Sequence, residues 1–398
     1  MAIRQTLRNV SAFNYMHETH SKEAFDPRMN RKIPIGIIGC GTISSTYLKA
    51  ARLFDILQVV ACADIDMERA RRQAEKYDVP KVCIVEELLA DTEIEIVVNL
   101  TTPNAHAGVA LKAIAAGKAV YGEKPLATRR TDGKAILEAA HAKQVRIGNA
   151  PDTFLGGGFQ TCIKLINDGQ IGTPVAATAF MLNHGMERWH PDPYFFYQPG
   201  AGPMFDIGPY YLTALIAMMG PIQRVTASMQ TTFPERTVTS EPKYGTKIPV
   251  NTSTHIAGIM EFASGAVGTI ITSFDVWHHR LPFIEIYGTE GTLSTPDPNR
   301  FDGPVFIRQA NDETWREVPL THGYTSNSRG LGIADMAYAI HSGRLHRANG
   351  EMAYHVLDII ESFIQSATEG RHLTLASTCV RPEPLNPGSH TWEEDQIE

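Results

Sequence analysis

The chain has 398 residues, 43% of them hydrophobic, and its 36 basic and 43 acidic side chains give a net charge of −7. This length and composition predict a globular protein of about two domains, each able to bury its own core. The acidic balance, with no dense lysine or arginine run, argues against nucleic-acid binding and favours work on a small molecule.

Membrane insertion, export and disulfide bonding are not expected. No apolar stretch approaches the ~20 residues that a membrane-spanning helix needs, and the first 32 residues lack the apolar centre of an export signal. The five cysteines, Cys40, Cys62, Cys83, Cys162 and Cys379, are odd in number and include no CxxC pair. We therefore expect a cytoplasmic protein with reduced thiols, no membrane partner and no metal site.

Residues 1–32 show no sustained periodicity and are predicted to form an N-terminal arm. Between residues 33 and 150, short β-branched runs alternate with amphipathic stretches of helical length; the runs lie at 35–38, 59–63, 96–100 and 119–121. Crossovers of this kind lay helices on both faces of a parallel sheet. The segment 33–150 is therefore predicted to be a doubly wound, Rossmann-type dinucleotide-binding domain.

Beyond residue 150 the pattern of hydrophobic residues changes. A glycine cluster at 156–158 introduces a helical pattern, and alternating segments then follow at 175–182, 223–231, 255–262, 266–272 and 283–287. They predict one large, mainly antiparallel open sheet. A late helix is expected at 352–368, with Gly370 as its stop. Residues 151–380 are thus predicted to form a second α/β domain, followed by an acidic tail at 381–398.

The first predicted strand leads directly into a GxGxxS loop, Gly39-Cys40-Gly41-Thr42-Ile43-Ser44, ahead of a predicted helix. Gly39 permits the tight turn, Gly41 lets the backbone approach a pyrophosphate, and the helix start offers free N–H groups. Ser44 replaces the third glycine and is small enough for close packing of helix on strand. We predict that Gly39, Gly41, Thr42 and Ile43 bind the cofactor.

Asp64 ends the second strand, some two dozen residues further on, where a carboxylate accepts hydrogen bonds from the adenosine ribose. Its charge would repel the 2′-phosphate of NADP, and neither Ile65 nor Asp66 supplies a cation to offset that repulsion. Arg69 and Arg71 keep NADP as the weaker alternative. NAD is the predicted cofactor.

Two further segments complete the set of motifs on which a family resemblance rests. They are Asn99-Leu100-Thr101-Thr102-Pro103-Asn104-Ala105-His106 and Gly122-Glu123-Lys124-Pro125-Leu126. With the glycine loop, they resemble the Gfo/Idh/MocA family of oxidoreductases over roughly residues 33–375. The resemblance implies a Rossmann domain followed by an α/β domain whose open sheet members commonly use to form homodimers or homotetramers. It also implies that the first segment lies against the cofactor, through Thr101, Thr102, Pro103, Asn104 and His106, and that Glu123 and Lys124 reach the nicotinamide.

Lys124 is the leading catalytic candidate, with contacts to both cofactor and substrate implied by the resemblance. A lysine in a cis-prone Glu-Lys-Pro turn at a strand end lies where open α/β sheets bind ligands, and desolvation there is expected to lower its pKa toward the working range. The alternative is a solvated surface lysine, as most lysines are. The resemblance favours catalysis.

A third segment, residues 200–211, is similar to the family's GGGxLxDxGxH region, with Tyr210 where many members carry a histidine acid/base. Tyrosine also stands there in glucose-fructose oxidoreductase and the dihydrodiol dehydrogenases. We expect Lys124 to lower the pKa of Tyr210, which exchanges a proton with the substrate oxygen, while Asp206 orients a substrate hydroxyl or holds the lysine. The alternative for Tyr210 is a packing aromatic.

A stretch rich in polar and aromatic groups precedes this segment and is predicted to face the substrate. Trp189 could stack on a sugar ring while His184, Glu187 or His190 bonds its hydroxyls. The run Trp277-His278-His279-Arg280 could add contacts. The turn at 152–155 lacks the arginine that the resemblance leads us to expect, which leaves the class of sugar open.

The sequence thus predicts an NAD-dependent oxidoreductase that moves a hydride between nicotinamide and a hydroxyl-bearing carbon of a sugar or polyol. Two alternatives remain: a glycoside hydrolase that retains NAD and works by transient oxidation, and an NAD-binding sensor without turnover. The set of Lys124, Asp206 and Tyr210 argues against the sensor, which needs no acid/base groups. It does not exclude the hydrolase.

Overall fold

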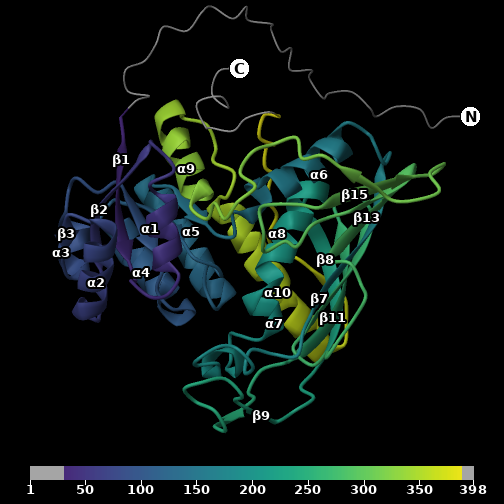
Figure 1. The fold of residues 1–398 in the computed structure, drawn as a ribbon, viewed down its shortest axis with the longest axis horizontal. Helices are drawn as coiled ribbons and strands as arrows, with labels where there is room; N and C mark the ends of the chain where they lie inside the picture. The colour runs from purple at the N-terminus through teal and green to yellow at the C-terminus, as the bar shows by residue number, and fades with distance from the viewer. Residues whose placement is uncertain (1–30, 388–398) are drawn as a thin grey trace, which may run out of the picture.

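The computed structural model describes residues 31–387, so the predictions for the arm at 1–30 and for the tail at 388–398 lie outside the described residues. Figure 1 shows an α/β domain formed by the first part of the chain beside a larger part built around a broad sheet. Among the described residues, no helix has both the length and the apolar character needed to cross a membrane.

The N-terminal domain is a parallel sheet with strand order β3-β2-β1-β4-β5-β6 and helices around it. Its elements are β1 (Ile33–Ile38), α1 (Ser44–Ala50), β2 (Leu57–Ala63), α2 (Met67–Tyr77), β3 (Lys81–Val82), α3 (Val85–Ala90), β4 (Ile96–Asn99), α4 (Pro103–Ala115), β5 (Ala119–Gly122), α5 (Arg130–Lys143) and β6 (Ile147–Asn149). The strand order reverses direction between β1 and β4. The loops after these two strands therefore open on the crevice where such sheets bind ligands.

The C-terminal part holds a second sheet, whose order over the described residues is β16-β15-β14-β13-β7-β12-β11-β8-β17. Its strands are β7 (Pro174–Leu182), β8 (Ile222–Gln230), β11 (His255–Phe262), β12 (Val267–Ser273), β13 (Ile284–Gly288), β14 (Gly291–Ser294), β15 (Val305–Gln309), β16 (Arg316–Val318) and β17 (Leu373–Thr374). Strands β7 and β12 pair in parallel, whereas the other neighbours are antiparallel.

Helices cover one face of this sheet, and a small lobe projects from its end (Figure 1). The helices of this part are η2 (Thr153–Leu155), α6 (Gly157–Asn167), α7 (Pro203–Asp206), α8 (Gly208–Met219), α9 (Leu331–Ser342) and α10 (Gly350–Glu369); α9 packs instead against β6 of the first domain. The lobe contains η3 (Tyr194–Tyr197) and the paired strands β9 (Glu235–Thr237) and β10 (Lys247–Pro249). The other face of the sheet carries exposed apolar side chains at Ile259 and Val267.

The predicted fold class is confirmed, and the five alternating segments coincide with β7, β8, β11, β12 and β13 to within two residues. The late helix is α10, which ends at Gly370 in the left-handed conformation (φ 65°). The sequence analysis missed α9. Residues 331–339 of that helix are all buried, so the segment lacks the polar face that marks an amphipathic helix.

Helix α10 joins the two domains. On one side it packs against α5, where a Cβ added to Gly133 would lie 2.9 Å from Leu357. On the other side it lies on the large sheet, where Phe363 fills the space above Gly258. The start of α5 is held to α10 by Arg130, whose guanidinium donates to the buried Asp358 at 3.0 Å and to Glu361 at 3.0 Å.

We predict that Arg130→Met destabilises the chain by roughly 2–4 kcal/mol, because the buried carboxylate of Asp358 would lose its cation. Urea unfolding monitored by fluorescence measures this change. Arg129→Met, an exchange at the neighbouring arginine, is the control and should change stability by less than about 0.5 kcal/mol. Equal losses in the two variants would contradict a specific clamp between the domains.

Candidate active site

The glycine loop after β1 contains two glycines with different surroundings. Gly39 has φ +100°, and a Cβ there would lie 2.6 Å from the backbone of Leu100, at the end of β4. A Cβ on Gly41, in contrast, would meet no atom within 4 Å. The buried Ser44 holds the loop by donating its hydroxyl to the Gly41 carbonyl at 2.6 Å. Gly39 is thus required by the fold, whereas Gly41 leaves an open backbone that a pyrophosphate can approach.

Asp64 connects β2 to this loop. Its carboxylate accepts the Cys40 N–H at 2.7 Å and the Asp66 N–H at 2.8 Å, and the side chain is almost fully buried. Each carboxylate oxygen keeps a lone pair for a ribose hydroxyl. The guanidinium of Arg69 lies 3.9 Å from Asp64 and 3.8 Å from Asp66, so two carboxylates compete for the cation that a 2′-phosphate would need. The site therefore fits NAD.

Ile65 is a residue that the sequence analysis weighed only for its lack of charge. Its side chain is 99% exposed, directly after Asp64. An apolar side chain left in solvent beside the ribose position offers a surface for the adenine ring. The sequence did contain a signal for this surface: Ile65 directly follows Asp64 and lies beyond the end of the apolar strand β2.

His106 links two of the predicted cofactor segments. Its Nδ1 lies 2.7 Å from the Pro125 carbonyl and its Nε2 lies 3.0 Å from the Thr101 carbonyl. Burial lowers the pKa of His106. Because both ring nitrogens are engaged inside the protein, His106 holds the turn before α4 against the Glu-Lys-Pro turn. Thr102 and Asn104, at the start of α4, are exposed and remain available to a ligand.

The Glu-Lys-Pro turn at the end of β5 is fixed from several sides. The Glu123 carboxylate accepts the Tyr47 hydroxyl at 2.8 Å and the Lys124 N–H at 3.0 Å. The side-chain amide of Asn149, on β6, donates to the carbonyls of Gly122 and Glu123. Glu123 thus fixes the backbone from which the Lys124 side chain projects.

The three predicted catalytic residues come together at the junction of the domains. The Lys124 ammonium lies 2.8 Å from the Asp206 carboxylate and also donates to the Asp206 carbonyl. Asp206 is the last residue of α7, and Tyr210 lies in the first turn of α8. The ammonium is 5.5 Å from the centroid of the Tyr210 ring. Of the two roles considered for Asp206, the structure shows it holding the lysine.

The expected lowering of the Lys124 pKa is wrong. Burial does lower it, but the charge of Asp206, assisted by Tyr210 and Glu123, has the greater combined effect, and the pKa is raised. Lys124 is therefore protonated at neutral pH. Two of its three N–H donors are directed at Asp206, which leaves one for a substrate oxygen.

Tyr210 is nearly buried, and its environment contains opposing charges. Burial raises the pKa of its phenol, Lys124 lowers it, Glu123 raises it and Arg329 lowers it again, with a net result above the ordinary value. The predicted effect of Lys124 is thus present but does not prevail over burial. Arg329, which immediately precedes the N-cap residue of α9, supplies one of these charges and was missed by the sequence analysis.

The residues predicted to bind the sugar lie in or beside the lobe. His184 stacks on Trp277 with ring centroids 3.3 Å apart, and burial lowers its pKa. Trp189 is 64% exposed and meets the edge of His190. Among the described residues, the ring contacts of His184 and Trp189 are with other aromatic side chains of the same region, and none of these contacts involves Lys124.

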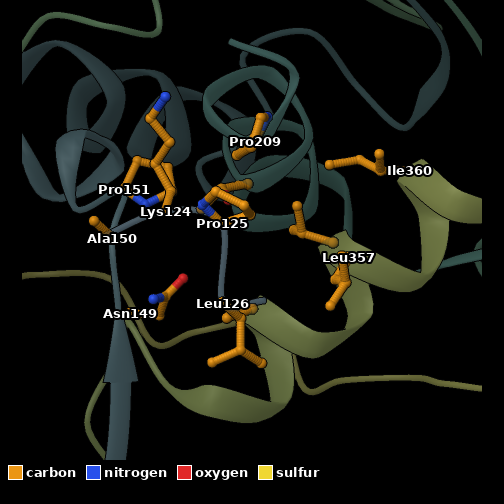
Figure 2. A pocket seen from close by; sticks show the side chains of 12 residues that line it. Lys124, Pro125, Leu126, Asn149, Ala150, Pro151, Pro209, Leu357 and Ile360 are labelled. Atoms are coloured by element: carbon orange, nitrogen blue, oxygen red, sulfur yellow. The ribbon is translucent and has the colours of Figure 1, made fainter. Parts of the chain in front are cut away.

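A small cavity lies behind the Glu-Lys-Pro turn. Leu126 and Leu357 help to line this cavity, and Figure 2 shows the Lys124 side chain extending away from both of them. Its other lining residues are Pro125, Asn149, Ala150, Pro151, Pro209, Thr213, Ala353, Val356 and Ile360. This mainly apolar lining suits packing between domains better than binding of a polyol.

In the described part of the chain, no group of three or more His, Cys, Asp or Glu side chains is placed to hold a metal ion.

Two family models match the chain. Residues 33–150 match "Oxidoreductase family, NAD-binding Rossmann fold", and residues 159–294 match "GFO/IDH/MocA C-terminal domain". The chain belongs to the Gfo/Idh/MocA family of oxidoreductases. The resemblance predicted from the motifs and the predicted NAD-type cofactor are thereby confirmed.

Curated relatives in this family differ in how much of the chain they match. An inositol 2-dehydrogenase of Burkholderia cenocepacia is 32% identical over 40% of this chain and 49% of its own length. A 1,5-anhydro-D-fructose reductase of Ensifer adhaerens is 27% identical over 72% of this chain and 82% of its own. The chain matches about half the length of the first curated relatives.

A solved structure of a levoglucosan dehydrogenase with NADH and levoglucosan has the same fold. It superposes with a TM-score of 0.76 over 87% of this chain and all of the other, at 22% identity. At that identity the likeness establishes architecture alone.

We predict that Gly41→Ala leaves the unfolding midpoint within about 2 °C of wild type yet weakens NADH binding at least about tenfold, because the new methyl group occupies the approach to the pyrophosphate. Thermal unfolding and NADH fluorescence titration measure the two effects. Gly39→Ala is the matched comparison and should lower the midpoint as well, since its Cβ collides with the backbone of Leu100. Unchanged NADH affinity in Gly41→Ala would contradict the placement of the cofactor.

Proposed function

We propose that this family member is an NAD-dependent dehydrogenase that oxidises a hydroxyl-bearing carbon of a sugar or polyol, or reduces the corresponding carbonyl. The observation that carries the proposal is the cluster of Lys124, Asp206 and Tyr210. The segment 33–150 would serve as the nucleotide domain and 151–380 as the substrate domain. The printed names of two relatives, inositol 2-dehydrogenase and 1,5-anhydro-D-fructose reductase, support a polyhydroxylated substrate.

In the oxidation, a secondary alcohol becomes a ketone as its carbon loses a hydride and its oxygen loses a proton. Bound NAD supplies the hydride acceptor. The phenolic oxygen of Tyr210, when ionised, takes the proton from the substrate hydroxyl. The free N–H of Lys124 donates to the same substrate oxygen and stabilises the negative charge that develops there. Asp206 keeps the lysine in place through its ion pair.

The raised pKa of Tyr210 determines how this chemistry depends on pH. At neutral pH the phenol is protonated, which suits donation of a proton to a carbonyl during reduction. Oxidation needs the phenolate, and its fraction increases as pH rises toward the pKa. Oxidation should therefore accelerate with pH, whereas reduction should proceed at neutral pH and fail only when the phenol ionises.

We predict that Lys124→Ala and Tyr210→Phe each reduce NADH formation at least about a hundredfold. The assay follows NADH absorbance with NAD or NADP in a panel of inositols, aldoses, ketoses, levoglucosan and aryl glycosides. Tyr211→Phe is the control, because its hydroxyl donates to the Phe180 carbonyl and takes no part in the cluster. Release of an aglycone without net NADH would refute the dehydrogenase and support an NAD-retaining hydrolase.

We also propose that the chain works in the cytoplasm as a homodimer or homotetramer formed through the open sheet. The described cysteines are buried and free, which suits a reducing compartment. The exposed side chains of Ile259 and Val267 on the outer face of the sheet support association there.

We predict that Ile259→Glu reduces the solution mass to that of one chain, because a charge on this face opposes its burial. Light scattering coupled to size exclusion measures the mass. Leu345→Glu, at an exposed site after α9, is the control and should keep the wild-type mass. A wild-type chain that is already monomeric would overturn the proposal.

A further inference from the structure

Exposed aromatic side chains gather at one end of the large sheet. In the described part of the chain, all but one of the exposed phenylalanine, tyrosine and tryptophan side chains lie between residues 189 and 283. Strands β7 and β12 are parallel and end together at Leu182 and Ser273. Strand β8 ends beside them, because Gln230 and Ser273 both pair with His255. The segments that follow these three strands therefore leave the sheet at the same end, where the lobe lies (Figure 1).

The lobe is fastened to the sheet by a buried ion network. The guanidinium of Arg236, on β9, donates to the Glu187 carboxylate at 2.9 Å and also pairs with Asp275. It donates to the Phe274 carbonyl at 2.8 Å, and the Tyr197 hydroxyl donates to Glu187. Glu187, which the sequence analysis considered for a sugar hydroxyl, is therefore engaged inside the protein. Because separating buried charges is costly, the network keeps the lobe surface in a fixed arrangement.

Four side chains of the lobe form an aromatic cluster: Trp189, His190, Phe195 and Phe196. The His190 ring lies 5.5 Å from Trp189 and 5.7 Å from Phe195, and the two phenylalanine rings are 3.9 Å apart. Trp189 is 64% exposed and meets His190 in a T-shaped contact, which covers at most one face of the indole. The cluster thus presents an aromatic surface to solvent that a ligand ring can cover.

Backbone hydrogen bonds join the aromatic cluster to the proposed catalytic centre. The Phe196 carbonyl accepts the Gly202 N–H at 2.9 Å, and the Gly202 carbonyl accepts the N–H of Asp206, the partner of the catalytic lysine, at 3.0 Å. The lobe also reaches the first domain, since a Cβ on Gly200 would lie 3.4 Å from the side chain of Thr128. The aromatic cluster therefore belongs to the same junction of the domains as the reacting groups.

The charge of the lobe limits what its surface can bind. Segments 183–202 and 231–254 contain four cationic and four anionic side chains, so the lobe has no net charge with its histidines neutral. At the surface, Asp192 pairs with Lys243 at 2.7 Å. An anionic ligand would find little counter-charge here. Aromatic faces beside neutral polar groups instead suit an uncharged sugar, which presents C–H groups to the ring and hydroxyls at its edge.

We propose that the aromatic cluster is a second sugar subsite, which binds the non-reacting unit of a neutral disaccharide or glycoside. The inference rests on the proposed function and names its class of substrate. Helix α7 separates the lobe from Lys124, so a ring that reacts at the lysine leaves Trp189 to another unit. The Nδ1 of His190 accepts the Asp192 N–H at 3.0 Å. In the neutral ring, Nε2 then carries the proton and donates to a hydroxyl of the unit that stacks on Trp189.

The first test compares kcat/KM for NADH formation from cellobiose, maltose, trehalose and sucrose with the values for their monosaccharides. Wild type should prefer at least one disaccharide by about tenfold or more, and Trp189→Ala should reduce that preference by about tenfold or more. Trp189→Phe, which keeps an aromatic face, should recover part of it. A wild type without this preference, or a preference that survives in Trp189→Ala, would overturn the proposal.

Trp315→Ala is the matched control for this exchange. Trp315 is also exposed, and it precedes β16 at the opposite end of the sheet, so its loss should leave the preference for disaccharides unchanged. Light scattering checks whether the aromatic cluster instead joins two copies of the chain. A lower solution mass for Trp189→Ala than for wild type would identify such an interface and overturn the proposal.

The second test does not depend on turnover. Calorimetric titration of the NADH-saturated chain with the same disaccharides should give a Kd that is at least about tenfold higher in Trp189→Ala than in wild type or Trp315→Ala. No disaccharide binding that depends on Trp189 would overturn the inference, and monosaccharide oxidation would still support the proposed function. Binding that depends on Trp189, with no NADH formed from any sugar, would keep the subsite and refute the proposed function.

Discussion

An ammonium group that leaves water needs a fixed counter-charge, and in this chain the counter-charge of Lys124 comes from the other domain. Lys124 is attached to the end of β5, whereas Asp206 lies at the end of α7, and they meet at 2.8 Å. A displacement of one domain against the other would leave both charges partly buried and unpaired. The packing of α10 on α5, with Arg130 on Asp358, prevents such a displacement. The ion pair of Lys124 and Asp206 thus depends on a rigid junction.

The nucleotide crevice supplies the other half of the site. Gly39 packs against Leu100, and His106 bridges Thr101 to Pro125, so the loops after β1, β4 and β5 form one connected surface. At one end of this surface, Asp64 offers a carboxylate and Ile65 an exposed apolar side chain, against which the adenosine of a dinucleotide would fit. At the other end, Lys124 projects toward Tyr210. A dinucleotide spanning this surface would bring its reactive ring to the lysine and the tyrosine.

The electrostatics of Tyr210 explain why a tyrosine can stand where many relatives have a histidine. A buried phenol resists ionisation, and one cation held by a carboxylate compensates this only in part. Arg329 adds a second positive group whose immediate partners are neutral. The inter-domain hydrogen bonds of Asp152 hold that arginine in place. In this arrangement, the ionisation of the tyrosine depends on residues from both domains.

The sequence by itself determined the features that depend on neighbouring residues. The strand-loop-helix order around Gly39 and Gly41, the acid at the end of β2 and the Glu-Lys-Pro turn are local patterns, and hydrophobic periodicity marked most strands and α10. Only the tertiary structure decided the charge of Lys124, the bridging role of His106, the aromatic contacts of His184 and Trp189, and the effect of Arg329 on the pKa of Tyr210. The physical reason is that burial and charge at a site come from residues far apart in the chain: Asp206 lies 82 positions from Lys124, and no local spacing encodes that contact.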